Sequence, residues 1–343
     1  MFIFNPFDVV AKMVTKEITR SALTHGRDLL DRYEDYQKAK KKQHVIMLGS
    51  SGVGKTSYIC STYRELAEKR IDDFSIKALS KEEHEALFNK GERIRQGIYP
   101  SSTDVRELYT FILKHADCEL LKFDWEDYRG GILESANEEM AEVAEKMKIA
   151  DGLIIFFNAY ELVHSINSKK IRRYCDIISS LVLNAVSARN EKERLPIAIV
   201  VTKCDTVNKN ELIKSANFEY VAEKVTKRIK DAVKVVLRVF YSQTVGGECL
   251  ISEPILFIME GCLRKKICET YKDIDQKYES ANYYREIDTP INMLGEILTG
   301  RSSNKDLEMR RIYEVKELSN YRKNLEKAHL KILRALENNK KNK

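Results

Sequence analysis

Residues 44–59 read HVIMLGSSGVGKTSYI, and this stretch decides the fold. Its beginning, Val45–Leu48, is typical of a buried parallel strand, and the residues from Ser57 to Ala67 have the pattern of a helix. The joining residues are mostly glycine and serine, so little side chain stands between the two elements. A strand, a small-residue loop and a helix in this order are typical of an anion-binding site.

The glycines of this loop explain why an anion fits there. Gly49, Gly52 and Gly54 permit a backbone with positive φ and no Cβ, so successive N–H groups can turn inward around the anion. Lys55 begins the helix, where its ammonium reaches phosphate oxygens, and the Thr56 hydroxyl is placed to bind a divalent cation. The loop matches G-x-x-x-x-G-K-[ST] in full. The residues predicted to hold phosphate are Gly49, Ser50, Ser51, Gly52, Val53, Gly54, Lys55, Thr56 and Ser57.

The composition limits the class of protein and the compartment that we expect. The 343 residues are 43% hydrophobic and 32% charged, which is typical of a globular protein with a sizeable core. The apolar start of the chain lacks the basic segment and cleavage site of a secretory signal, and no run approaches the roughly 18 apolar residues of a membrane helix. Seven cysteines without a CxxC pair favour buried thiols in a reducing compartment. We therefore expect a cytoplasmic protein.

The net charge of +7 is mild for this length and demands no nucleic-acid partner. Much of the basic character lies in two runs, KAKKKQ (Lys38–Gln43) and the terminal NNKKNK, which are typical of solvated faces or linkers. Neither run contains aromatic residues that would stack on bases. We expect no specific nucleic acid, and a weak electrostatic contact with an anionic membrane or RNA stays open as an alternative.

Alternating strands and helices follow the loop. Strands are predicted at 45–48, 106–114, 119–123, 152–157, 197–201 and 237–241, and helices at 57–67, 132–148, 161–190, 209–235 and 254–266, with a further helix inserted in the polar stretch 72–96. The strands at 106–114 and 119–123 form a hairpin. The pattern predicts an α/β fold of the P-loop NTPase type, a three-layer α/β/α sandwich whose mostly parallel sheet contains one antiparallel hairpin strand.

Helical flanks extend this domain at both ends. Val10, Val14, Ile18 and Ala22 recur every four residues, which predicts an N-terminal amphipathic helical segment over 1–43. The α/β domain with the phosphate loop would span 44–268, and a C-terminal helical extension 269–343, with GRSSNKD (Gly300–Asp306) as the linker. Within the extension, an apolar series steps by three and four: Leu318, Tyr321, Leu325, Ala328, Ile332 and Ala335. Such a series either packs on the domain or binds a partner.

A second motif narrows the ligand to guanine. The segment VVTKCD ends a buried strand, which places Thr202, Lys203 and Asp205 at the sheet edge where open α/β sheets bind ligands. A carboxylate there can accept hydrogen bonds from guanine N1–H and its exocyclic amine, a paired donor edge that adenine lacks. The aliphatic stem of Lys203 can lie over the purine ring.

With these two motifs, residues 44–268 resemble the guanine-nucleotide-binding P-loop proteins, the class that includes translation factors, Ras-like switches and dynamin-like proteins. The resemblance implies bound GTP or GDP with Mg²⁺. It also implies that the backbone near Ser242 and Gln243, in YSQT, helps to hold the guanine carbonyl. In YPSSTD, Thr103 would be the first-switch hydroxyl that reaches Mg²⁺ and the γ-phosphate, with Ser101 or Ser102 as the alternative.

For the second switch, the family pattern Asp-x-x-Gly matches Asp127 to Gly130 in FDWEDYRGG, and Asp124 is the competing carboxylate. Either would hold Mg²⁺ through water, and the Gly130 N–H would contact the γ-phosphate. Ras-like switches place next a Gln that orients the attacking water, but here Gly131 follows. We therefore expect slow intrinsic hydrolysis, helped by Arg129 in cis, by a second copy or by a partner protein. Expected catalytic residues are Lys55, Thr103, Arg129 and Gly130, and expected metal ligands are Thr56, Thr103, Asp124 or Asp127.

FDWEDYRGG and the helical flanks are also similar to the bacterial double-GTPase type of conflict and defence systems, which implies a regulatory or assembling GTPase. The expected function is a GTP-hydrolysing switch or assembly protein whose flanks engage a protein partner or a second copy. One alternative is a P-loop nucleotide or small-molecule kinase with Arg93 and Arg95 on a lid, although TKCD would then have no role. Another is a scaffold that binds nucleotide without hydrolysing it.

Overall fold

The chain is known from a computed structural model, which describes residues 42–68, 71–100, 106–133, 138–166, 168–189, 194–232, 234–243, 251–286 and 304–341. Gln43–Lys343 forms one compact unit. The amphipathic segment predicted over 1–43 lies outside the described residues except for its last two positions. In the described part of the chain, no helix combines the length and the apolar character required to cross a bilayer.

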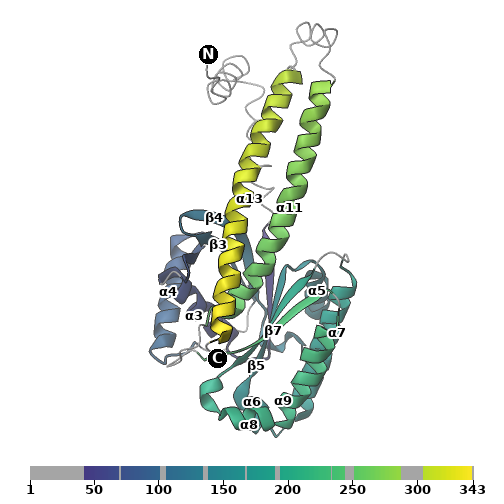
Figure 1. The fold of residues 1–343 in the computed structure, drawn as a ribbon. Coiled ribbons are helices and arrows are strands. Elements are labelled where there is room, and N and C mark those ends of the chain that lie inside the picture. The colour runs from purple at the N-terminus through teal and green to yellow at the C-terminus, as the bar shows by residue number, and fades with distance from the viewer. Residues whose placement is uncertain are drawn as a thin grey trace. The chain divides into compact units, whose positions relative to one another are not determined.

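A single seven-stranded sheet forms the centre of this unit (Figure 1). Its strands are β1 (Gln43–Leu48), β2 (Phe74–Ala78), β3 (Glu107–His115), β4 (Cys118–Asp127), β5 (Gly152–Asn158), β6 (Leu195–Thr202) and β7 (Val235–Tyr241), in the order β2-β3-β4-β1-β5-β6-β7. Only β3 runs against its neighbours, and the other described pairs are parallel. The predicted fold, a mostly parallel sheet with one antiparallel hairpin and surrounding helices, is confirmed.

The strand β2 was not predicted. We expected a helix inserted in 72–96, and the helix α4 (Lys81–Arg95) is present, with Ser80 Oγ accepting a hydrogen bond from Glu83 N at 3.0 Å. The earlier part of the stretch instead forms β2, in which alternate side chains are buried at the edge of the sheet beside β3. A five-residue edge strand carries a weak sequence signal, because its hydrogen bonds come from a partner more than thirty residues away.

The remaining helices differ from the prediction mainly at breaks and ends. They are α3 (Lys55–Glu68), α5 (Glu138–Ile149), α6 (Ala159–His164), α7 (Ser168–Ser187), α8 (Lys209–Lys214), α9 (Ala216–Val221), a π-helical turn η3 (Ala222–Lys227) and α10 (Arg228–Lys230). Short 3₁₀ turns, η1 (Gly130–Leu133) and η2 (Cys204–Thr206), follow β4 and β6. The predicted helix over 209–235 breaks near Ser215, whose hydroxyl caps α9 by accepting from Phe218 N. It ends before Val235, the first residue of β7.

Apolar side chains on the two faces of the sheet form separate cores. Val45 and Met47 belong to the core beneath α3 and the C-terminal helices, whereas Ile46 and Leu48 belong to the core beneath α5 and α7. This division follows from the alternation of side chains along a strand. Helices therefore cover both faces, as the predicted three-layer arrangement requires.

The C-terminal helices α11 (Glu253–Glu286) and α13 (Asn304–Lys341) lie side by side and form an antiparallel hairpin, whose distal half extends beyond the sheet (Figure 1). Four residues at the lower end of α13, Leu325, Ala328, Ile332 and Leu336, are buried in the same core as α3. The helix α11 continues without a break through position 268, where the sequence suggested a domain boundary. The hairpin and the sheet thus share one core.

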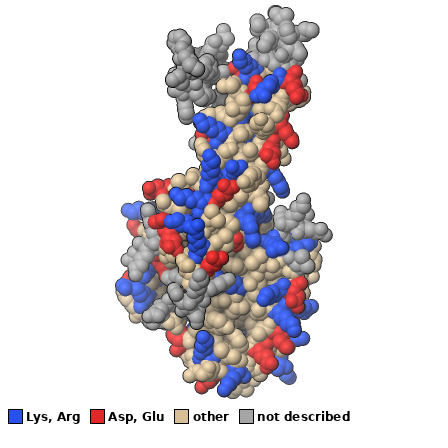
Figure 2. All heavy atoms as spheres, viewed as in Figure 1, with Lys and Arg blue, Asp and Glu red and all other residues tan. Residues whose placement is uncertain are grey.

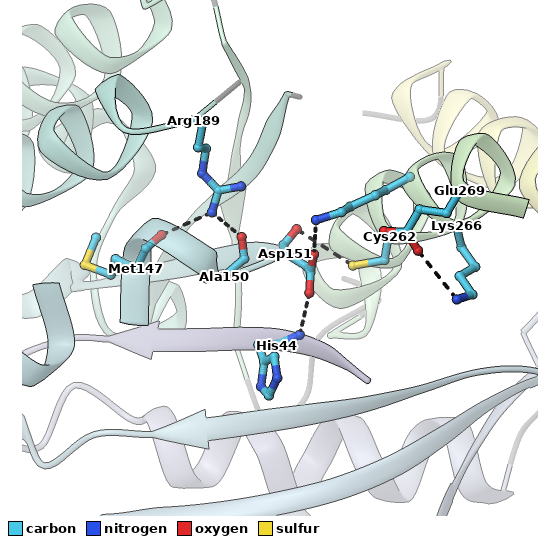
Figure 3. Close-up of polar contacts among 9 residues, drawn as sticks. His44, Met147, Ala150, Asp151, Arg189, Cys262, Lys266 and Glu269 are labelled. Atoms are coloured by element: carbon cyan, nitrogen blue, oxygen red, sulfur yellow. Dashed lines mark hydrogen bonds and ion pairs between the residues drawn. The ribbon is translucent and has the colours of Figure 1, made fainter. Parts of the chain in front are cut away.

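A buried carboxylate ties α11 to the starts of β1 and β5 (Figure 3). Asp151 Oδ2 accepts a hydrogen bond from His44 N at 2.8 Å, and Asp151 Oδ1 pairs with Lys265 Nζ at 2.8 Å. Beside it, Arg189 donates hydrogen bonds to the carbonyl oxygens of Met147 and Ala150. These contacts lie at the amino ends of the parallel strands, at the opposite edge of the sheet from the carboxyl ends that carry the sequence motifs.

Candidate nucleotide site

The loop after β1 adopts two left-handed glycine conformations. Gly52 has φ +70° and Gly54 has φ +99°, so a side chain at either position would be strained. Gly49 is required for a different reason, because a side chain at this position has no room. A Cβ there would lie 2.7 Å from Val53 Cγ1 and 3.0 Å from Phe156 Cβ. The sequence argument gave all three glycines the same role, but positive φ is required at only two.

Lys55 is held inside the loop by the loop's own carbonyl groups. Its Nζ donates to Gly49 O at 3.1 Å and to Ser50 O at 3.3 Å, and only 7% of the residue is exposed. Burial lowers the pKa of the Lys55 ammonium, and the Asp127 carboxylate opposes this shift. The loop therefore presents a fixed cation that faces an acidic group on the neighbouring strand.

Asp127 joins the end of β4 to the start of α3. Its Oδ2 accepts a hydrogen bond from Thr56 Oγ1 at 2.9 Å. The residue is 3% exposed, and burial raises its pKa from 3.8 to about 6, with Lys55 and the Thr56 hydrogen bond acting in the opposite direction. Asp127 Oδ1 is buried and accepts no hydrogen bond from any described residue. An unsatisfied carboxylate oxygen beside a threonine hydroxyl is a donor set that suits a hard divalent cation.

Asp124, the competing carboxylate, lies elsewhere. It accepts a hydrogen bond from Thr110 Oγ1 at 2.7 Å and stands 3.6 Å from His44 Nδ1. Positions 124 and 127 differ by an odd number in one strand, so the two side chains point to opposite faces of the sheet. The structure brings Asp127, and not Asp124, to the phosphate loop.

The backbone at Gly130 packs directly against the phosphate loop. A Cβ on Gly130 would lie 2.1 Å from Ser51 N and 2.5 Å from Ser50 C, so no other residue fits without displacement. Neighbouring Arg129 pairs with Glu139 at the start of α5, where its Nε donates to Oε2 at 2.9 Å and its Nη2 donates to the same oxygen. Thr103, Ser101 and Ser102, from the expected first switch, lie outside the described residues.

The TKCD segment makes hydrogen bonds to the phosphate loop. Thr202 Oγ1 donates to Val53 O at 2.6 Å, and Lys203 Nζ donates to Gly52 O at 2.9 Å. Lys203 itself has φ +56°, which turns the chain from β6 into η2 and carries Asp205 to the pocket. Ser242 N donates to Val201 O at 2.8 Å, which places the end of β7 beside the same turn.

These segments line one pocket of about 460 Å³. Of the predicted site residues, the pocket contains Ser51, Gly52, Val53, Gly54, Lys55, Thr56, Ser57, Asp127, Arg129, Gly130, Thr202, Lys203, Asp205, Ser242 and Gln243. Gly49 and Ser50 do not line the pocket, but their carbonyl groups accept hydrogen bonds from Lys55 Nζ. Arg93 and Arg95, proposed for a kinase lid, are in α4 and do not line it, and Arg95 pairs with Glu92. Sequence reasoning missed Tyr58, Tyr99, Pro100, Tyr128 and Thr206, all of which stand beside quoted motif residues.

Comparison with known proteins shows that the part of the chain containing this site matches one protein family. The family model described as Double-GTPase 2 matches residues 43–246, which cover β1 to β7 and every described pocket residue. No curated protein matches the chain.

Solved structures of similar fold share little sequence with the chain. The signal recognition particle receptor SRb-GTP/SRX complex from Chaetomium thermophilum has 12% identity and a TM-score of 0.38, over 64% of this chain and 98% of that one. The Arl6 BBS3 small GTPase from Trypanosoma brucei has 15% identity and a TM-score of 0.40, over 65% and 99%. The S. cerevisiae Ski7 GTPase-like domain bound to GTP has 14% identity and a TM-score of 0.38, over 66% and 52%.

Proposed function

The chain belongs to the Double-GTPase 2 family, and we propose that it is a Mg²⁺-dependent switch or assembly protein that binds and hydrolyses GTP. One observation carries the proposal: a single pocket is lined at one end by the phosphate loop and at the other by Asp205. The hydrogen bonds from Thr202 and Lys203 to the loop hold these ends at a fixed separation. One ligand with an anionic tail and a base that offers paired donors suits both ends.

At the phosphate end, backbone N–H groups of the loop and the N-terminus of α3 would surround the β-phosphate. The Lys55 ammonium would neutralise charge on the β- and γ-phosphates. The Thr56 hydroxyl and the unsatisfied Asp127 Oδ1 would hold Mg²⁺, directly or through water. When bound, the metal would neutralise charge that builds on the phosphate oxygens during hydrolysis.

At the base end, the Asp205 carboxylate would accept hydrogen bonds from guanine N1–H and the exocyclic amine. The Lys203 stem, fixed by its hydrogen bond to Gly52 O, would cover one face of the purine. Backbone groups near Ser242 and Gln243 would contact the guanine carbonyl from the end of β7. The Asp205 carboxylate requires hydrogen-bond donors on the base, whereas adenine presents its N1 acceptor at that edge. The site should therefore reject ATP.

The switching step would involve the two segments nearest the γ-phosphate. The Gly130 N–H beside Ser51 and the Thr103 hydroxyl would be ordered by the γ-phosphate and released after hydrolysis. Because Gly131 stands where related switches use a Gln to position water, the intrinsic rate would be slow. Arg129, a second copy or a partner protein would then supply the missing stabilisation.

Competitive displacement of a fluorescent GDP analogue by GTP and ATP tests this function. We expect GTP to compete strongly and ATP to compete weakly. Asp205→Asn should weaken GTP and strengthen XTP, because xanthine presents an acceptor where guanine presents an amine and an amide can donate to it. Lys55→Ala should reduce affinity about 10- to 100-fold, whereas Lys90→Ala on the exposed side of α4 should not. Tight ATP binding with negligible GTP binding would refute the proposal.

A further inference from the structure

The outward side of α13 carries cations without carboxylates. Between positions 305 and 334, ten residues of this helix are exposed, and six of them are Lys or Arg, two are Asn and two are apolar. They are Lys305, Arg310, Ile312, Lys316, Asn320, Lys323, Asn324, Lys327, Leu330 and Arg334. Lys316, Lys323, Lys327 and Arg334 follow at steps of seven, four and seven, so they lie on one face. We name these four residues the cationic ridge.

Three acidic residues of α13 contact α11 instead. Glu314 is held by Lys277 and by Arg311, Glu308 pairs with Arg285 at 2.7 Å, and Glu326 accepts from Tyr271 at 2.9 Å. Within the described residues, the ridge cations have no ion-pair partner. The positive field at the base of the hairpin also reaches His115, whose pKa is lowered by burial and by Lys331 and Lys327.

The outward side of α11 has the complementary chemistry. Tyr271, Asp275, Tyr278 and Glu279 lie on one face at steps of three, four and seven, and we name them the tyrosine–acid stripe; one exposed cation, Lys272, lies on the same face. Tyr271 and Tyr278 are 43% and 56% exposed, so both rings are available for contact. Figure 2 shows the same division, with acidic side chains gathered along the α11 edge of the hairpin and basic ones along α13.

Contacts inside the hairpin set the two surfaces at matching heights. The Lys277–Glu314 and Arg285–Glu308 pairs place Asp275 and Glu279 level with Lys316. The hydrogen bond from Tyr271 to Glu326 places the lower end of the stripe near Lys323. A second hairpin, related to the first by a twofold axis that runs parallel to the helices, would therefore set Lys316, Lys323 and Lys327 opposite a carboxylate or a tyrosine.

We propose that two copies of this chain associate through their hairpins, with the cationic ridge of each copy against the tyrosine–acid stripe of the other. This inference extends the assembly role in the proposed function. The pairing is argued from the hairpin surfaces alone, and only its biological role rests on the proposed function. Such a contact is isologous, so one pairing occurs twice in the dimer. The chain already uses the same chemistry internally, since the Arg322 guanidinium lies over the Tyr271 ring at 4.4 Å.

A second copy explains both surfaces, whereas a polyanion explains only one. An anionic membrane or a nucleic acid would attract the ridge, but the carboxylates of the stripe would repel it and the exposed parts of the tyrosine rings would stay uncovered. Tyrosine and arginine are also the residues most enriched at protein interfaces. The observations thus favour association between copies.

Charge exchange in the full-length chain tests the pairing. The ridge variant is Lys316→Glu, Lys323→Glu and Lys327→Glu, and the stripe variant is Asp275→Lys and Glu279→Lys. Sedimentation equilibrium of the wild-type chain should show a dimer whose dissociation constant rises with salt. Each variant alone should weaken dimerisation about tenfold or more, because like charges then face each other twice. An equimolar mixture of the two variants should dimerise again, since both contacts in the mixed pair join opposite charges.

A matched control separates this effect from net charge. Lys214→Glu, Lys227→Glu and Lys230→Glu change the same number of exposed lysines on α8 to α10, away from the hairpin, and should leave dimerisation unchanged. A wild-type chain that stays monomeric, or a mixture of ridge and stripe variants that does not dimerise, would overturn the inference. Binding of monomers to anionic vesicles or RNA through the ridge would overturn it in favour of a polyanion. Displacement of fluorescent GDP does not involve the hairpin, so failure of the proposed function would be seen separately.

Discussion

Thr56 Oγ1 donates a hydrogen bond to Asp127 Oδ2 at 2.9 Å, which joins the first turn of α3 to the last residue of β4. The contact spans 71 positions in the chain and follows from the parallel pairing of β1 with β4, in which Met47 lies opposite Asp127. It leaves the other Asp127 oxygen buried without a partner among the described residues. The site therefore contains a buried carboxylate oxygen and a hydroxyl, a donor set that suits a divalent cation.

The first prediction concerns the pH dependence of Mg²⁺-supported nucleotide binding. The folded-state pKa of Asp127 is about 6, above its ordinary 3.8, so in the nucleotide-free protein this group binds a proton between about pH 4 and 6 that the unfolded chain releases. Its contribution to stability therefore falls as pH rises through that window. Mg²⁺ requires the carboxylate, so affinity should rise with pH and level off above pH 7, and it should be about tenfold weaker at pH 5 than at pH 7.5.

Asp127→Asn provides the control, because its amide does not titrate. Fluorescent GDP titrations at a fixed Mg²⁺ concentration should give weaker binding for this variant, with a smaller dependence on pH. Phosphate groups of the nucleotide titrate equally in both proteins, so the difference between the two curves isolates Asp127. The single tryptophan, Trp125, is fully buried two residues away and serves as a second reporter. Identical pH profiles for the two proteins would exclude Asp127 as the group involved.

The second prediction concerns the contact between Gly130 and the phosphate loop. Gly130→Ala introduces a Cβ 2.1 Å from Ser51 N, so the two segments must separate. Overpacking of this kind costs about 1–3 kcal/mol, and we expect GTP affinity to fall roughly 10- to 100-fold. Gly97→Ala is the matched change, since its Cβ meets open space although its φ is +83°. It should lower thermal stability slightly and leave GTP affinity as in the wild type, and equal effects of both variants on affinity would contradict the steric explanation.

The third prediction concerns Arg129, which the structure shows paired with Glu139. If this pair restrains the guanidinium, Glu139→Gln should raise the single-turnover rate of GTP hydrolysis severalfold, and Arg129→Ala should lower it about tenfold or more. The double variant should equal Arg129→Ala, because Glu139 would act only through Arg129. Breaking the exposed pair should change stability by less than about 1 kcal/mol. An increase from Glu139→Gln that persists without Arg129 would assign the effect to another group.

The fourth prediction concerns the anchor of the hairpin. Asp151→Ala removes the partner of both His44 N and Lys265 Nζ and should reduce the free energy of unfolding by about 2–4 kcal/mol in urea titrations. Lys265→Met keeps the hydrogen bond to His44 N and should cost roughly 1 kcal/mol. GDP affinity should not change in either variant, because the anchor and the pocket lie at opposite edges of the sheet. A loss of GDP affinity in both variants would instead indicate coupling between the hairpin and the site.

Local patterns were enough to predict the nucleotide motifs and most elements. The spacing GSSGVGKT between a strand and a helix, and TKCD at a strand end, depend on residues close in sequence, so no knowledge of distant contacts was needed. The same reasoning failed where stability comes from a distant partner. The strand β2 depends on β3 for its hydrogen bonds, and the helix predicted over 254–266 continues to Glu286 because α11 packs along α13 and the sheet core.

The sequence by itself determined the residue types of the candidate site, since the proposed phosphate and base contacts each follow from a short motif. Only the tertiary structure decided between Asp124 and Asp127, because the register of β4 on β1 and the alternation of strand side chains set which carboxylate meets Thr56. It also joined Thr202 and Lys203 to loop residues 149 and 151 positions earlier, and it left four cations of α13 and two carboxylates of α11 on exposed helix faces. These relationships depend on three-dimensional packing, which residue spacing along one segment does not encode.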